Sequence, residues 1–286
     1  MRTHAIPRRH AARGFTLVEV TVTMLIIVVL ITLVFAGVTA ALRSAREAGE
    51  RQLVSSVARA VDQFRQQFGF LPPLADDENP VDETNNVVRV RDAAFLRFES
   101  DLDKTRWSET SLGIYLLGIL EKDVDGIDGP GMTKPTEGGG FAKGGARIEP
   151  LLDAARMTDR IKRDQASGFE FADIHDRWGG ELRYYRWLPR FYRTGAQKGQ
   201  IETLNTPSCG LGAAGKPIYL LGDPAEDPAL RAATWAIVCS GPNRFFGDEP
   251  ASDLPAMRAK LAMDDSASEE AVRRKAASDN IWEAGK

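Results

Sequence analysis

An uncharged apolar segment near the N-terminus sets the first limit on the fold of this chain. No residue from Val20 to Leu42 carries a charge, and these roughly 23 residues would span about 35 Å as an α-helix. That length is enough to cross a hydrocarbon core of about 30 Å. Arginines precede the segment and an acidic bulk follows it, so the positive-inside rule places the N-terminus in the cytoplasm and the rest outside. We predict a single-pass membrane protein.

Two other interpretations of this segment stay open. A cleaved secretory signal could use the small residues Val38, Thr39 and Ala40, but its apolar region would be only about 7–15 residues long. A plain uncleaved anchor would leave Gly14 and Glu19 without a role. Glu19 is unusual in such a segment, because an ionised side chain at mid-bilayer costs about 2.5–3.5 kcal/mol on insertion scales.

Residues 14–19 read Gly-Phe-Thr-Leu-Val-Glu and follow a leader with four arginines and no acid. This pattern resembles the type III signal of type IV pilins and of type II secretion pseudopilins. The resemblance implies that prepilin peptidase removes residues 1–14 by cutting after Gly14 and N-methylates Phe15. Glu19 would then be the fifth residue of the mature chain.

This processing would give Glu19 a physical role. Cleavage creates an ammonium group on Phe15, about one helical turn from Glu19. An unpaired charge is costly in the dry core of a helical filament, so the Glu19 carboxylate of one subunit could pair with the Phe15 ammonium of a neighbour. Such a pair would set the axial register, as one polar residue does in a coiled coil.

The helix is expected to continue well past the apolar segment. The apolar residues Val54, Val57, Val61, Phe64 and Phe68 recur at steps of three and four, which is typical of one buried helical face. Gly69 would end the helix, and Pro72-Pro73 prevents its continuation. We predict one helix over residues 16–68, about 80 Å long. Residues 15–42 would form the membrane and filament-core part, 43–72 an amphipathic continuation, and 73–286 a globular periplasmic domain.

The remaining chain predicts an α+β, pilin-like fold in which the long helix packs on a small antiparallel sheet. We expect a loop over residues 74–86, a short buried helix over 111–120, flexible loops over 123–145, and one or two exposed helices within 252–277. Asp176, Trp178, Gly179 and Tyr184 resemble the Asp-x-Trp-Gly-x-x-x-x-Tyr element of major pseudopilins of the G type. Gly179 and Gly180 would allow a tight turn there, Trp178 would have a packing role at the base of the sheet, and a strand would begin at Leu182. A second strand is expected at residues 234–240.

Residues 240–248 resemble a loop of the same family that binds calcium in several members. The resemblance implies oxygen ligands from Asn243, Asp248 and Asp279. Asn243 stands where aspartate is common, and Arg244 replaces a small residue. A charged surface loop without a metal is therefore the alternative.

Composition argues against several functions. The net charge is −3, and the four leader arginines leave −7 for the rest of the chain, which disfavours nucleic-acid binding. Of three histidines only His175 follows the leader, so a multi-histidine centre is not expected. Cys209 and Cys239 could form a disulfide or stay as buried thiols. No nucleophile elbow or Cys/His pair indicates an enzyme.

We therefore predict a non-enzymatic pseudopilin of a type II secretion-like system, anchored in the inner membrane and assembled into a periplasmic filament. Its partners would be prepilin peptidase, copies of itself, other pseudopilins and an inner-membrane assembly platform. A type IV pilus subunit is the first alternative. A membrane-anchored periplasmic enzyme or binding protein is the second.

Overall fold

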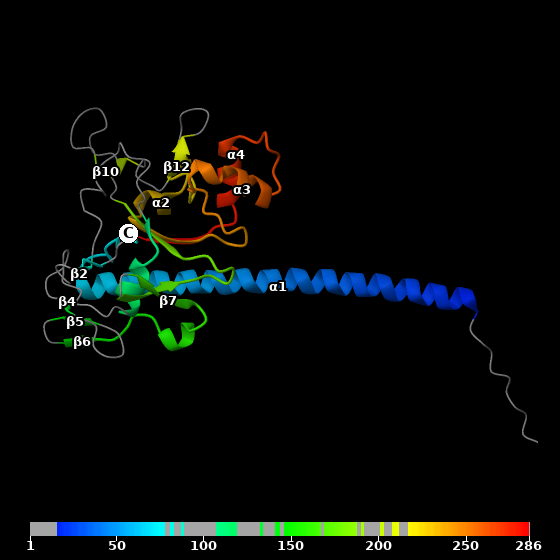
Figure 1. The fold of residues 1–286 in the computed structure, drawn as a ribbon, viewed down its shortest axis with the longest axis horizontal. Helices are drawn as coiled ribbons and strands as arrows, with labels where there is room; N and C mark the ends of the chain where they lie inside the picture. The colour runs from blue at the N-terminus through cyan, green and yellow to red at the C-terminus, as the bar shows by residue number, and fades with distance from the viewer. Residues whose placement is uncertain are drawn as a thin grey trace, which may run out of the picture. The chain divides into compact units, whose positions relative to one another are not determined.

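A computed structural model describes residues 16–77, 81–82, 87–88, 107–118, 132–133, 141–143, 146–166, 169–187, 190–191, 201–202, 208–211 and 217–285. The chain divides into two compact units, Met1–Glu47 and Ala48–Lys286, and we call the second unit the head. Helix α1 (Leu17–Phe68) runs through both units without a break (Figure 1). The predicted single long helix is thereby confirmed.

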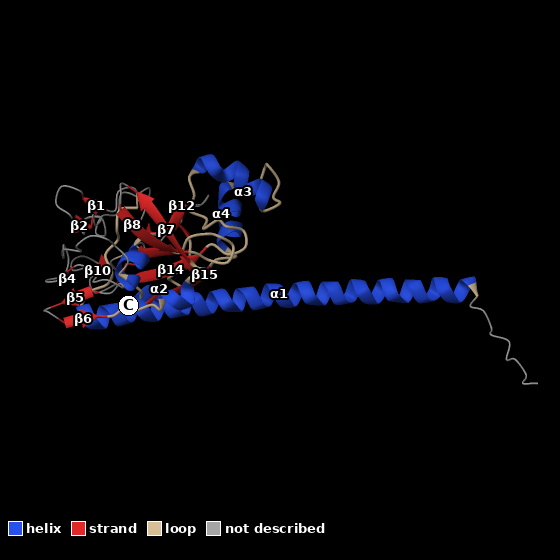
Figure 2. Ribbon diagram, turned by 60° about the horizontal axis from the view of Figure 1, so that its bottom comes forward, coloured by secondary structure: helices blue, strands red, loops and turns tan. Residues whose placement is uncertain are grey.

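The head mixes short strands with short helices, which confirms the α+β fold class (Figure 2). The strands are β1 (Val81–Asp82), β2 (Val87–Val88), β3 (Trp107–Ser108), β4 (Met132–Thr133), β5 (Phe141–Lys143), β6 (Ala146–Ile148), β7 (Ile161–Ala166), β8 (Phe169–Ile174), β9 (Arg183–Arg186), β10 (Arg190–Phe191), β11 (Ile201–Glu202), β12 (Ser208–Leu211), β13 (Pro217–Tyr219), β14 (Trp235–Cys239) and β15 (Ile281–Gly285). The helices are the π-helix η2 (Gly113–Leu117), the 3-10 helices η3 (Ala154–Met157) and η5 (Ala251–Asp253), and α2 (Pro228–Ala232), α3 (Leu254–Lys260) and α4 (Glu269–Ala277).

The second half of α1 forms one side of the main hydrophobic core. The predicted apolar stripe is buried, as the positions of Val54, Val57, Val61, Phe64 and Phe68 show. The helix ends where predicted. Gly69 has φ +85°, a left-handed conformation that favours glycine, and its N–H donates to the Arg65 carbonyl at 2.8 Å.

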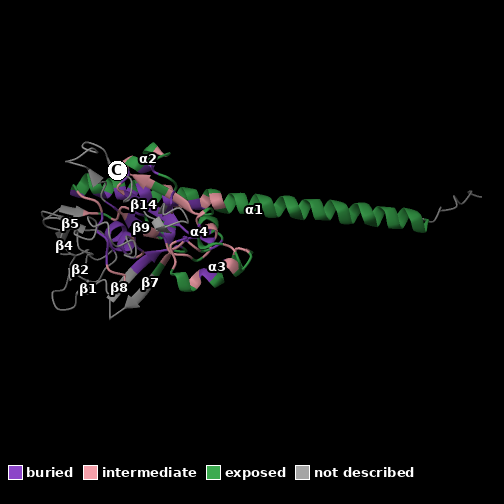
Figure 3. Cartoon of the chain, turned by 90° about the horizontal axis from the view of Figure 1, so that it is seen from above, coloured by how far each residue is buried: buried purple, intermediate pink, exposed green. Residues whose placement is uncertain are grey.

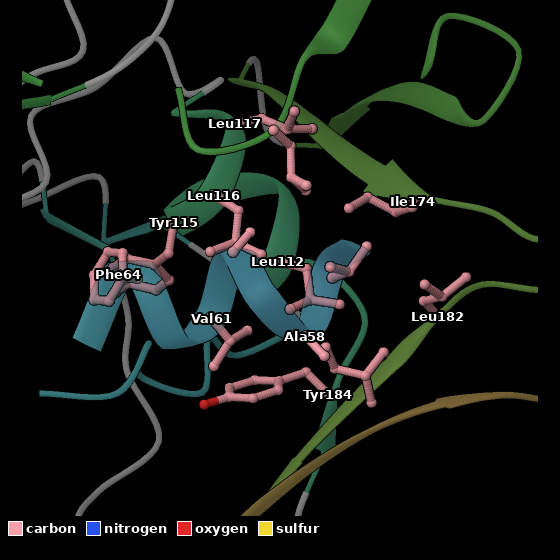
Figure 4. Close-up of a cluster of buried hydrophobic side chains, with 14 of the residues drawn as sticks. Ala58, Val61, Phe64, Leu112, Tyr115, Leu116, Leu117, Ile174, Leu182 and Tyr184 are labelled. Atoms are coloured by element: carbon pink, nitrogen blue, oxygen red, sulfur yellow. The ribbon is translucent and has the colours of Figure 1, made fainter. Parts of the chain in front are cut away.

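The apolar stripe of α1 packs against η2 and against residues of β8 and β9, such as Ile174 and Tyr184 (Figure 4). The Phe64 ring lies 5.8 Å from the Tyr115 ring, centroid to centroid. Helix η2 packs tightly on β8 at Gly113, where an added Cβ would lie 1.5 Å from the Ala172 carbonyl oxygen. The helix predicted for residues 111–120 therefore exists, but as a π-helix that ends at Gly118 in the left-handed region.

The central sheet has the strand order β15-β14-β9-β3, and its pairs are antiparallel. All five residues of β14 are buried, which confirms the predicted strand. Trp235, Ile237 and Cys239 join the main core, whereas Ala236 and Val238 join a second cluster with Leu220 and Phe246. Side chains alternate across a strand, so both faces of β14 are covered, and its sequence is continuously apolar for that reason.

A buried ion pair joins α1 to the turn before β7 within the head. The Glu50 side chain has no exposed area, and its Oε1 lies 2.7 Å from Arg160 Nη2. Arg177 Nε lies 3.5 Å from the same oxygen. Removing one member of such a pair would leave an uncompensated buried charge.

Helices α3 and α4 make a small core of their own, composed of Leu254, Met257, Val272 and Ala276. The prediction of one or two helices in residues 252–277 is confirmed, although one side of each helix is buried rather than exposed. Arg273 is buried as well, and its Nη1 donates to the carbonyls of Gly247 and Glu249 at 2.8 Å.

Two predicted loops contain extended structure. The acidic segment 74–86 includes β1, which pairs with β2, and segment 123–145 includes β4 and β5, which form a sheet with β6. The loop prediction relied on the turn-forming residues in both segments. A strand of two or three residues is too short to show an alternation of apolar and polar side chains, so the sequence did not indicate these strands. The rest of both segments lies largely outside the described residues.

Candidate functional site

The N-terminus of α1 is closed by a pair of reciprocal hydrogen bonds between Thr16 and Glu19. The Glu19 N–H donates to Thr16 Oγ1 at 3.2 Å, and the Thr16 N–H donates to Glu19 Oε2 at 2.9 Å. Thr16 Oγ1 also donates to Oε2 at 3.0 Å. This arrangement is a capping box, which satisfies backbone donors at a helix start. Glu19 therefore has a local role that the sequence analysis missed; Gly14 and Phe15 lie outside the described residues.

The first part of α1 is exposed (Figure 3), and its surface is largely apolar. Large apolar side chains from Leu17 to Leu42 are between 45% and 81% exposed. Among the described residues, α1 is the one helix long and apolar enough to cross a membrane. Water is a poor solvent for such a surface, so lipid or other apolar helices must cover it.

The threonines of this segment are compatible with an apolar surrounding. The hydroxyl groups of Thr21, Thr23, Thr32 and Thr39 all donate to backbone carbonyls three or four residues earlier, at 2.6–3.0 Å. A hydroxyl group without a partner would be costly in hydrocarbon. These bonds remove that cost inside the helix itself.

The Asp-x-Trp-Gly element forms a tight turn between β8 and β9. Asp176 Oδ1 accepts the N–H groups of Trp178 and Gly180, both at 2.8 Å, and Gly179 has φ +82°. A Cβ on Gly180 would lie 2.7 Å from Ser240 Oγ. Trp178 is partly buried against the main core. The predicted turn and the packing role of Trp178 are thereby confirmed.

Two of the three residues considered for calcium, Asn243 and Asp248, are hydrogen-bonded to other protein groups in this structure. Asn243 Oδ1 accepts the Phe245 N–H, and Asn243 Nδ2 donates to the Ala276 carbonyl, both at 2.7 Å. Asp279 is exposed in the turn after α4. Calcium binding by these residues stays a prediction, and it would have to compete with these contacts.

The third of these residues, Asp248, belongs to a network around a largely buried arginine. Its Oδ1 lies 2.7 Å from Arg183 Nη1, and its Oδ2 accepts from the Tyr185 hydroxyl at 2.7 Å. The Arg183 guanidinium lies between the rings of Trp107 and Phe246, 3.8 and 3.9 Å from their centroids. Both oxygens of Asp248 are thus engaged by protein donors.

Cys239 is a free, buried thiol on β14. Its Sγ donates to Asp176 Oδ2 at 3.2 Å. Burial, followed by the negative charge of Asp176, raises the pKa of this thiol. Cys239 is therefore a thiol in this structure. The side chain of Cys209 lies outside the described side chains, and a disulfide between the two cysteines stays a prediction.

The structure also brings together a cluster that the sequence analysis did not identify. Ligand atoms of Asp173, His175 and Glu181 all lie within 4.8 Å of one another. Burial raises the pKa of the adjacent Glu109 to about 7, helped by a hydrogen bond with Glu181. Burial and the charge of Lys162 lower the pKa of His175. One feature of the sequence could have indicated this cluster. Asp173 and His175 are two residues apart, as on one face of a strand, and they precede the Gly179-Gly180 turn.

Comparison with known proteins identifies the N-terminal segment. Residues 9–35 match the family model of the prokaryotic N-terminal methylation motif. The match includes Gly14, Phe15 and Glu19, and it is common to pilins and pseudopilins. No curated protein and no solved structure matches the chain.

Proposed function

We propose that this chain is a pseudopilin, a structural subunit of a type II secretion-like system that assembles into a periplasmic filament. One observation carries the proposal: the methylation motif at residues 9–35 runs directly into a long helix with an exposed apolar surface. Cleavage by prepilin peptidase after Gly14 would leave Phe15 one residue before the helix cap at Thr16. Processing would therefore release a helix whose start is already formed.

Before assembly, the apolar part of α1 crosses the inner membrane. The arginines of the leader stay in the cytoplasm, and the acidic remainder of the chain is exported. Lipid covers the exposed side chains between Leu17 and Leu42. During assembly, equivalent helices of other subunits replace this lipid, and close packing between helices supplies the favourable contacts.

Glu19 serves both stages. Within the single chain both capping bonds from Thr16 use Oε2 of the carboxylate. The cap therefore leaves Oε1 available to a second donor, and the Phe15 ammonium of a neighbouring subunit would supply it. The charge is tolerated near the membrane edge and pairs in the filament, where an unpaired charge would be costly.

The turn at residues 176–180 favours a pseudopilin over a pilus subunit. Its Asp-x-Trp-Gly sequence resembles that of major pseudopilins. The Asp176 carboxylate accepts the backbone N–H groups of Trp178 and Gly180. These hydrogen bonds explain why an aspartate stands at the start of this turn. A type IV pilus subunit is the first alternative, because it would share the same N-terminus. A membrane-anchored enzyme or binding protein is the second, with no catalytic motif in its favour.

The test is the N-terminal mass of the chain after expression with prepilin peptidase. We expect a mature protein that starts at N-methylated Phe15, and we expect the Gly14→Glu variant to keep its leader. A mature protein that starts at Ala41 would support the secretory-signal interpretation and contradict the proposal. Electron microscopy of overexpressing cells then separates the two filaments: long surface fibres would favour the pilus subunit.

A further inference from the structure

We propose that Asp173, His175 and Glu181 form a binding site for a divalent transition-metal ion of the zinc class in the head. This inference goes beyond the proposed function and does not depend on filament assembly. It rests on the backbone geometry of the three residues, on the distances between their ligand atoms, and on the chemistry of His175.

The backbone holds the three side chains on one face of a hairpin. His175 and Glu181 are directly opposite each other in an antiparallel bridge. Asp173 lies two residues before His175 on β8, so its side chain points to the same face. The Asp176 N–H donates to the Gly180 carbonyl, and the Leu182 N–H donates to the Ile174 carbonyl, both at 2.8 Å. These bonds fix the positions of the backbone on both sides of the bridge.

The ligand atoms are close enough to reach one ion. The three atoms lie within 4.8 Å of one another, whereas ligands about 2.0–2.2 Å from a tetrahedral zinc ion are about 3.3–3.5 Å apart. Binding would draw the farthest atoms together by at most about 1.5 Å. Rotation about side-chain torsions supplies such a movement without a change in the backbone.

The donor set indicates which kind of ion would bind. His175 Nε2 is buried and has no hydrogen-bond partner among the described residues. A buried nitrogen without a partner is costly, and a metal ion would accept its lone pair. One imidazole with two carboxylates suits zinc and similar ions, whereas calcium prefers oxygen ligands alone.

The neighbouring charges both support and oppose a cation. The Glu109 carboxyl group hydrogen-bonds Glu181 and would be the fourth ligand, the third with an oxygen donor, although its Oε1 also accepts from Arg183 Nε at 3.0 Å. Lys162 lies opposite Asp173 in the β7–β8 register and is exposed; a metal ion would displace its charge toward solvent. Asp176 is not a ligand, because its two oxygens accept from the backbone and from Cys239.

The experiment uses the full chain in detergent micelles, with His4 and His10 replaced by glutamine. His175 is then the one remaining histidine. Zinc is titrated into the metal-free protein by calorimetry, and X-ray absorption at the zinc edge reports the ligands. We expect one zinc per chain, with one imidazole and oxygen ligands.

Variants in the same background test the individual ligands. His175→Gln is expected to weaken zinc binding by more than the roughly 10–100-fold that loss of an outer-shell partner costs. Glu181→Gln is expected to weaken it as well, whereas Asp265→Asn, which removes an exposed carboxylate elsewhere, should not. Circular dichroism checks that each variant folds.

Two outcomes would overturn the proposal before any of the three ligands is changed. One is the absence of zinc binding by the folded background protein, and the other is a bound zinc whose absorption spectrum lacks an imidazole. Equal zinc affinity with and without the His175 imidazole would also overturn it. None of these results bears on processing at Gly14, so the proposed function can fail or hold independently.

Discussion

Glu19→Gln separates the two roles that the structure and the proposed assembly give to this residue. The amide oxygen of glutamine can still accept the Thr16 N–H, which Glu19 Oε2 accepts at 2.9 Å. Capping boxes accept either residue type at this position. The substitution therefore keeps the start of α1 and removes the negative charge. Thr16→Val is the complementary change, because it removes the capping hydroxyl and keeps the charge.

The two roles differ in expected magnitude. Loss of a helix cap costs about 0.5–2 kcal/mol, and the long helix that follows can absorb this cost. An ammonium buried without its partner costs about 3–5 kcal/mol, which corresponds to roughly 10²- to 10⁴-fold in an association constant. We therefore expect Glu19→Gln to abolish filament elongation and Thr16→Val to weaken it slightly.

The assay compares processed protein with assembled protein in the same cells. N-terminal mass first confirms cleavage in each variant, because Gly14 and Phe15 are unchanged. Sheared filaments and crosslinked multimers are then quantified against the wild-type chain. Filaments at the wild-type level from processed Glu19→Gln, together with their loss in Thr16→Val, would refute the charge pair and assign Glu19 to capping alone.

Three further predictions concern the head. Gly113→Ala is expected to destabilise the fold by at least about 3 kcal/mol, because the new Cβ would lie 1.5 Å from a backbone carbonyl oxygen of β8; Gly49→Ala, whose nearest contact is 3.6 Å away, is the control in urea unfolding. Burial raises the pKa of Glu109 from 4.5 to about 7, so the folded chain holds this proton more tightly and loses stability as the pH rises through that range. Glu109→Gln should flatten the slope between about pH 5 and about pH 8, and an unchanged slope would contradict the assignment. In a Cys209→Ala variant, the buried Cys239 thiol should resist thiol reagents until the chain is unfolded; rapid labelling of the folded chain would count against its burial.

The sequence alone determined the features that depend on local patterns. Charge distribution and apolar length predict the exposed part of α1, and steps of three and four predict the buried stripe that ends at Phe68. Gly69 and the Gly179 turn could be predicted because special backbone conformations favour glycine. The methylation motif could be recognised from the sequence as well, because a peptidase acts on contiguous residues.

The tertiary structure decided which polar side chains meet. Glu50 and Arg160 are 110 residues apart and form a buried pair, and Arg183 engages Asp248 from 65 residues away. The same holds for Glu109 and Glu181, and for the contact that requires a glycine at residue 113. Such contacts depend on the path of the chain and on which face of each strand is covered. Neither is encoded in local spacing, so a carboxylate that resembles a metal ligand in the sequence can be an arginine partner in the fold.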